Sequence, residues 1–209
     1  MRSTFARARG GRIKVRLGDA DRGVVAGLLE AVADLLDPEV DAAADPDAGP
    51  AAGPDAAGGR AGPDDASLWA SLEADLAVEP PSDPAVARLL PDASRDDPEL
   101  AQSFRRLTEQ DLRERKRDSL GLAAAALRRS APVVLDDSEA QALLKGLTDV
   151  RLVLAERLGI ATDEDAELLH AALAAGASQG GQEWAKAAEL YEVVTYLQEE
   201  LVHTLLPSG

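Results

Sequence analysis

Two glutamate–histidine pairs are the residues of this chain whose spacing could bind a metal. Glu167 precedes His170 by three positions and Glu200 precedes His203 by three, so each carboxylate shares a helical face with an imidazole. Di-iron helical bundles combine two such motifs with further inward-facing glutamates. Here one motif lies on a short predicted helix. The other lies just before Pro207, where a helix dipole accounts for a histidine. We therefore predict no metal site and no cofactor, and a helical-bundle metalloenzyme is only an unfavoured alternative.

Adjacent carboxylates could serve as acid–base partners, but their positions favour a structural role. Asp96–Asp97 and Asp136–Asp137 each stand at the predicted start of a helix, where a carboxylate accepts hydrogen bonds from free backbone N–H groups. No serine lies in a nucleophile-elbow motif, and no glycine-rich loop has the spacing of a phosphate-binding loop. The chain has no cysteine, which excludes disulfides, thiolate ligands and thiol redox sensing within it. We predict that it is not an enzyme.

Two groups of basic residues are candidates for binding a partner. Arg12, Lys14 and Arg16 alternate with apolar residues, so they share one face of a predicted strand, and β-ribbons can read DNA grooves. The second group lies on a long charged helix and consists of Arg105, Arg106, Arg113, Arg115, Lys116 and Arg117. The helix also carries acidic residues three or four positions away, so intrahelical ion pairing or a solvated face would explain these charges too. We predict that the helix binds a protein partner, while nucleic-acid binding by the strand is possible but not favoured.

The composition limits the class of protein. The chain has 209 residues, 38 of them acidic and 22 basic, and its formal charge of −16 would repel a polyanion over most of the surface. Aromatic residues make up only 3% of the chain, so alanine, leucine and valine must form the core, which suits packed helices. No apolar run reaches the roughly 20 residues of a membrane span, and the N-terminus lacks the apolar segment of a secretory signal. We expect a cytoplasmic protein that does not bind membranes.

Hydrophobic periodicity predicts a mainly α fold, a helical bundle with a short N-terminal β-hairpin. The hairpin spans residues 3–17 and turns at Gly10–Gly11, and a helix capped by Asp19 or Asp21 follows it and ends at Pro38. Further helices are expected at 67–76, 84–90, 98–129 with a possible break near Gly121, 136–158, 163–175 and after the 178–181 loop. In domain terms, the hairpin and first helix (1–36) and a helical bundle (67–209) form one domain. A disordered insertion rich in Ala, Asp, Gly and Pro separates them at 37–66.

Four segments resemble an actinobacterial family of domains of unknown function. They are RLLPDASRDDP (88–98), FRRLTEQDLRERK (104–116), LTDVRLVL (147–154) and LYEVVTYLQ (190–198). The hairpin and first helix fit as well, so the resemblance covers nearly the whole chain except residues 37–65. The family includes the oxidative-stress transcriptional regulator AosR, and its genes lie beside those of a Clp-protease adaptor, a JAMM-type metallopeptidase and cysteine-synthesis enzymes.

The resemblance implies a cytoplasmic transcriptional regulator that acts through a protein partner, with a sigma factor or RNA polymerase suspected. The process it implies is oxidative-stress or cysteine-supply control, and an adaptor role in Clp proteolysis is an alternative. Because this chain has no cysteine, redox sensing by a disulfide is either absent or located in the partner. The oligomeric state does not follow from the sequence.

Overall fold

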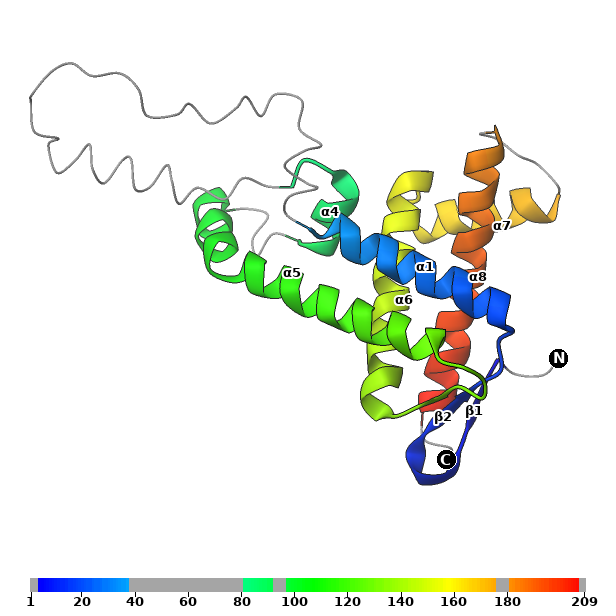
Figure 1. The fold of residues 1–209 in the computed structure, drawn as a ribbon. Helices are drawn as coiled ribbons and strands as arrows, with labels where there is room; N and C mark the ends of the chain where they lie inside the picture. Colours follow the sequence, from blue (N-terminus) through cyan, green and yellow to red (C-terminus); the bar gives the residue numbers. More distant parts are fainter. Residues whose placement is uncertain (1–3, 38–80, 92–96, 176–180, 207–209) are drawn as a thin grey trace, which may run out of the picture.

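The protein is a bundle of helices with a small antiparallel sheet at one end (Figure 1). The structure, a computed structural model, describes residues 4–37, 81–91, 97–175 and 181–206. The helices in these ranges are α1 (Asp19–Leu35), α4 (Pro84–Leu89), α5 (Pro98–Arg128), α6 (Asp137–Leu158), α7 (Asp163–Ala174) and α8 (Gly181–Leu205). This confirms the predicted mainly α fold with an N-terminal hairpin. The helix expected at 67–76 and most of the insertion expected at 37–66 lie outside the described residues.

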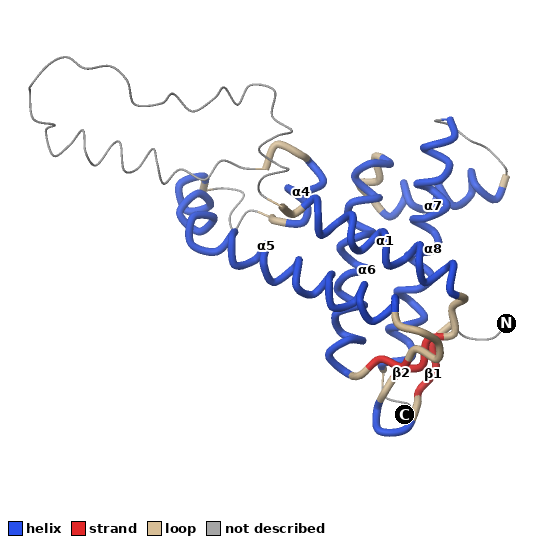
Figure 2. Tube along the Cα trace, in the orientation of Figure 1, coloured by secondary structure: helices blue, strands red, loops and turns tan. Residues whose placement is uncertain are grey.

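The hairpin forms as the alternating pattern predicts. Strand β1 (Phe5–Arg7) pairs antiparallel with β2 (Ile13–Val15), and Phe5 lies opposite Val15. Gly10 and Gly11, in the short 3₁₀ turn between the strands, both have positive φ, a conformation that favours glycine. A third strand that was not predicted, β3 (Val134–Leu135), pairs with the other side of β2 (red in Figure 2). With only two residues, β3 is too short to show the alternation of apolar and polar residues that predicts a strand.

The helices surround one main core. Helices α1 and α5 run side by side, and α6 packs against α5, α4 and α8 (Figure 1). Leucine, valine and alanine dominate this core, as expected from the scarcity of aromatic residues. A smaller apolar cluster joins α7 to the end of α6 and the first half of α8, and its buried residues are Ala155, Ile160, Leu169, Ala188 and Tyr191.

Helix starts follow the predicted cap chemistry with one exception. Asp97 caps α5, and Asp136 forms a reciprocal capping box with Glu139 at the start of α6. The expectation for α1 was wrong, because its N-cap is Gly18 and no side chain caps it. Asp19 lies one position inside the helix, where it pairs with an arginine and meets the positive end of the dipole.

Helix α5 is continuous through Gly121, so the possible break there does not occur. Its C-terminal half is held between α1 and α6, which stabilises helical geometry at a residue of low helix propensity. Among the described residues, no helix has both the length and the apolar character needed to cross a membrane.

Candidate functional site

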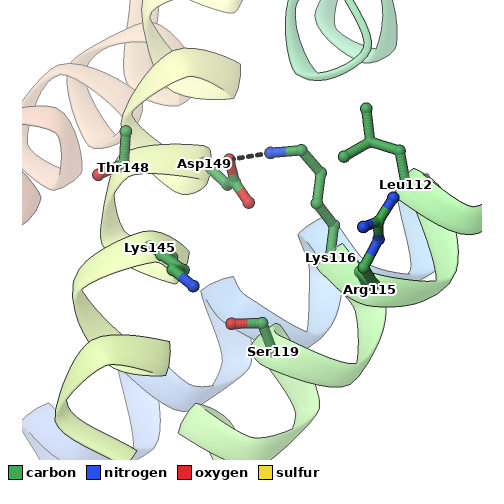
Figure 3. A pocket seen from close by; sticks show the side chains of 7 residues that line it. All are labelled: Leu112, Arg115, Lys116, Ser119, Lys145, Thr148 and Asp149. Carbon is green, nitrogen blue, oxygen red and sulfur yellow. Dashed lines mark hydrogen bonds and ion pairs between the residues drawn. The ribbon is translucent and has the colours of Figure 1, made fainter. Parts of the chain in front are cut away.

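A surface pocket of about 420 Å³ lies where α5 meets α6 (Figure 3). Side chains from both helices line it: Leu112, Arg115, Lys116 and Ser119 from α5, and Lys145, Thr148 and Asp149 from α6. Three cations face one carboxylate, so the lining carries a formal charge of +2 within a strongly acidic protein.

One wall of the pocket is an ion pair between the two helices. The Nζ atom of Lys116 lies 2.6 Å from Oδ1 of Asp149, and only 22% and 9% of the two side chains is exposed. Partial burial protects such a pair from solvent screening. The pair therefore holds α5 against α6 and fixes the shape of this wall.

The other walls contain polar groups with and without partners. The Thr148 hydroxyl donates to the Leu144 carbonyl and accepts from Nε2 of Gln198, which ties the pocket to α8. Lys145 and Ser119 have no hydrogen-bond or ion-pair partner among the described residues, and they point toward one another across the pocket (Figure 3). The pocket thus combines a fixed framework with donors that are free to bind a ligand.

The predicted basic cluster on α5 does not form one free surface. Arg105 and Arg113 both pair with Glu109 on their own helix, and Nη1 of Arg113 also donates to the Leu36 carbonyl. Arg113 and Glu109 are both buried, and the Leu36 carbonyl that accepts from Arg113 lies just after the end of α1. Arg105 and Arg113 therefore make contacts within the protein: both pair within α5, and Arg113 also joins α5 to the residue that follows α1.

The remaining members of the cluster are placed differently. Lys116 pairs across to α6, and Arg117 pairs with Asp37 at 3.0 Å. Arg115 is exposed, and its Nε atom donates to the backbone carbonyl of Asp111. The side chain of Arg106 lies outside the described part of the chain. Intrahelical pairing was one of the open alternatives, but the pairs made by Lys116 and Arg117 reach other segments.

An apolar stripe on the first half of α5 was not singled out from the sequence. The stripe consists of Leu100, Phe104 and Leu107, which are spaced four and three residues apart. Their exposed fractions are 54%, 50% and 80%, respectively. This part of α5 extends past α4, away from α6 and α8 (Figure 1). The spacing of four and three residues is the signal by which the sequence alone could predict this stripe.

The hairpin cations occupy the face that the alternation predicts. Arg12, Lys14 and Arg16 are exposed, while Ile13 and Val15 between them are buried. The three cations, and Arg9 in the turn, have no ion-pair or hydrogen-bond partner among the described residues. They are therefore the largest group of unpaired positive charges in the part of the chain that the structure describes.

In each glutamate–histidine motif, one residue makes a different contact. Nδ1 of His170 lies 2.7 Å from Oε2 of Glu192, and a carboxylate oxygen of Glu200 accepts from the Thr4 N–H. His203 is exposed in the last turn of α8. Within residues 4–37, 81–91, 97–175 and 181–206, no three His, Asp or Glu side chains gather in a way that could hold a metal ion.

Three of the four segments that carry the family resemblance meet around the pocket. Segment 104–116 supplies Lys116, segment 147–154 supplies Asp149 and Thr148, and segment 190–198 supplies Gln198. A family model described as "Domain of unknown function (DUF2017)" matches residues 1–205. No curated protein and no solved structure matches the chain.

Proposed function

The chain belongs to the DUF2017 family, and we propose that it is a non-enzymatic cytoplasmic regulator that binds a protein partner through the first half of α5. The family resemblance described above makes a sigma factor or another RNA polymerase subunit the first partner to test. On the same resemblance we propose that the complex acts in oxidative-stress or cysteine-supply control.

The exposed apolar stripe of Leu100, Phe104 and Leu107 is the observation that carries this proposal. Solvent-exposed apolar side chains aligned on one helix face are typical of a helix that docks in an apolar groove of another protein. The basic residues expected to bind the partner are largely engaged with acidic groups of the same chain. We therefore propose that the partner binds mainly to the apolar stripe and not to the arginines.

Affinity purification with matched variants tests this proposal. The full chain is tagged, recovered from lysate of its own host at physiological salt, and the co-purifying proteins are identified by mass spectrometry. Phe104→Glu and Leu107→Glu should each weaken the complex by about thirtyfold or more, as loss of an interface hot spot of about 2 kcal/mol does. Leu168→Glu on α7, where 63% of the leucine is exposed, is the matched control and should leave the complex intact.

The outcomes separate the alternatives. Recovery of a sigma factor or polymerase subunits that is lost only in the α5 variants supports a transcriptional regulator. Recovery of Clp components or a metallopeptidase through the same stripe would assign the chain to proteolysis control. A partner that binds the stripe variants as tightly as the wild type would refute the site.

A second candidate function is direct DNA binding by the hairpin, and the unpaired cations favour it. Arg12, Lys14 and Arg16 could each contact a phosphate without breaking an ion pair in the described protein. Three phosphate contacts predict a salt-dependent affinity: the logarithm of the association constant for DNA should fall with the logarithm of the salt concentration, with a slope of about −2.7. The variant R12Q/K14Q/R16Q should abolish a gel mobility shift that Lys186→Gln preserves, and no shift of the wild type at low salt would remove this candidate.

A further inference from the structure

We propose that the pocket between α5 and α6 binds a small anionic metabolite that carries a phosphate or carboxylate group. The proposal concerns a binding site separate from the apolar stripe and does not depend on the partner function. The volume of the pocket, about 420 Å³, lies within the range of small-molecule sites.

The charge of the lining selects the class of ligand. Asp149 is already neutralised by Lys116 at 2.6 Å, so the positive charges of Lys145 and Arg115 remain uncompensated within the pocket. The whole chain has a formal charge of −16, so a locally positive pocket is not a general property of its surface. An anion placed here would replace a repulsion between cations with an attraction.

The hydrogen-bonding groups support the same class. The Lys145 ammonium and the Ser119 hydroxyl have no partner among the described residues and point toward the same space (Figure 3). Arg115 donates only its Nε–H to a backbone carbonyl, which leaves its Nη groups available at the pocket edge. Oxygen atoms of a phosphate or carboxylate accept hydrogen bonds from donors of these kinds, and bonds to charged donors are the stronger ones.

Other side chains of the pocket are held in place by contacts within the protein. The Lys116–Asp149 pair fixes one wall, and Thr148 is held by both Leu144 and Gln198. The apolar side chain of Leu112 lines the same pocket and suits an organic ligand better than a bare ion. A ligand would therefore bind without any large rearrangement of α5 or α6, which reduces the entropic cost of binding.

Titration of the isotopically labelled full chain tests the proposal. Inorganic phosphate and succinate serve as separate probes in amide NMR spectra, and binding should shift the amide signals of Ser119, Lys145 and Thr148 first. We expect a dissociation constant of about 1 mM or lower for at least one probe. Lys145→Met and Ser119→Ala should each weaken binding about tenfold, because each removes one hydrogen bond to a charged group.

Lys186→Met is the matched control, since Lys186 is an exposed lysine of α8 outside the pocket. Binding of phosphate alone assigns a phosphoryl ligand, binding of succinate alone assigns a carboxylate, and binding of both supports the general anion site. Absence of localised shifts with either probe would overturn the proposal. An equal loss of binding in Lys186→Met would overturn it too, because the effect would then be surface charge.

Discussion

At the scale of single residues, Arg22 shows how one buried charge joins three segments. Its guanidinium donates to the carbonyls of Leu17, Leu127 and Arg129, at 3.0, 3.1 and 3.3 Å, and pairs with Asp19 at 2.8 Å. The carbonyls at the end of α5 have no partner within the helix, and Arg22 supplies donors for two residues there. The chain from β2 to α1 is thereby fixed to the C-terminus of α5.

Replacing this arginine should destabilise the fold. We expect Arg22→Met to lower the free energy of unfolding by about 3 kcal/mol, because it leaves buried carbonyl groups without donors. Chemical denaturation followed by circular dichroism measures the change. Arg16→Met, at an exposed arginine nearby, should change the free energy by no more than about 0.5 kcal/mol. Equal effects of the two substitutions would show that Arg22 has no special structural role.

The Lys116–Asp149 pair makes a second prediction at this scale. We expect Lys116→Met to destabilise the protein by about 2 kcal/mol, since it leaves the mostly buried Asp149 carboxylate without its cation. The double variant K116M/D149L should recover much of that loss, because no buried charge then remains unpaired. A double-mutant cycle of unfolding free energies measures the coupling, and additive single effects would show that the ion pair contributes nothing.

At the scale of elements, the contact between α1, α5 and α6 depends on a glycine. A Cβ atom added at Gly146 would lie 2.5 Å from Cδ2 of Leu29 and 3.3 Å from Cδ2 of Leu120. Both leucines are fully buried, so a shift of either side chain must be accommodated by its neighbours in the core. The absence of a side chain at Gly146 therefore sets how closely the three helices pack.

Two glycine substitutions test this packing. Gly146→Ala should destabilise the protein by about 1–2 kcal/mol, because overpacking outweighs the gain in helix propensity. Gly121→Ala on α5 should stabilise it by about 0.5–1 kcal/mol, since an added Cβ meets no atom within 4 Å there. Thermal unfolding of the two variants gives the sign of each effect. Stabilisation by both substitutions would mean that the helices adjust to the added methyl group.

At the scale of the whole molecule, carboxylates on several elements tie stability to pH. Hydrogen bonds from Arg128 lower the pKa of Glu30, and backbone hydrogen bonds lower the pKa of Asp136 and Asp165 at helix starts. Partial burial raises the pKa of Asp83, but hydrogen bonds from Arg157 and the Ala85 N–H outweigh it, so that pKa is lowered as well. All four groups are thus more acidic in the folded chain than in the unfolded one.

The sign of the resulting pH dependence follows from linkage. A carboxyl group with a lowered folded pKa stabilises the fold above its unfolded value, here 3.8 for Asp and 4.5 for Glu, and loses this effect as pH falls through the folded pKa. We expect the unfolding free energy to be nearly constant at neutral pH and to decrease progressively below about pH 4.5. Denaturant titrations across this range measure it. The variant D136N/D165N should show a shallower decrease, and an unchanged curve would exclude these caps as a cause.

Local patterns in the sequence were sufficient to predict most of the elements. The alternation around Ile13, the Asp97–Pro98 helix start and the capping box at Asp136 depend on residues within a few positions of one another. Backbone conformation responds to such neighbours, so the hairpin and most helix limits were expected to within about two residues. The apolar stripe of α5 could also have been found by spacing alone.

Only the tertiary structure decided what the charged residues do. Lys116 meets Asp149 across 33 positions of sequence, and Arg22 reaches carbonyls more than 100 positions away. Which charges become paired, and which remain free on the hairpin or in the pocket, depends on how the helices pack. That packing follows from the combined apolar surfaces of many elements, and a single segment does not contain this information.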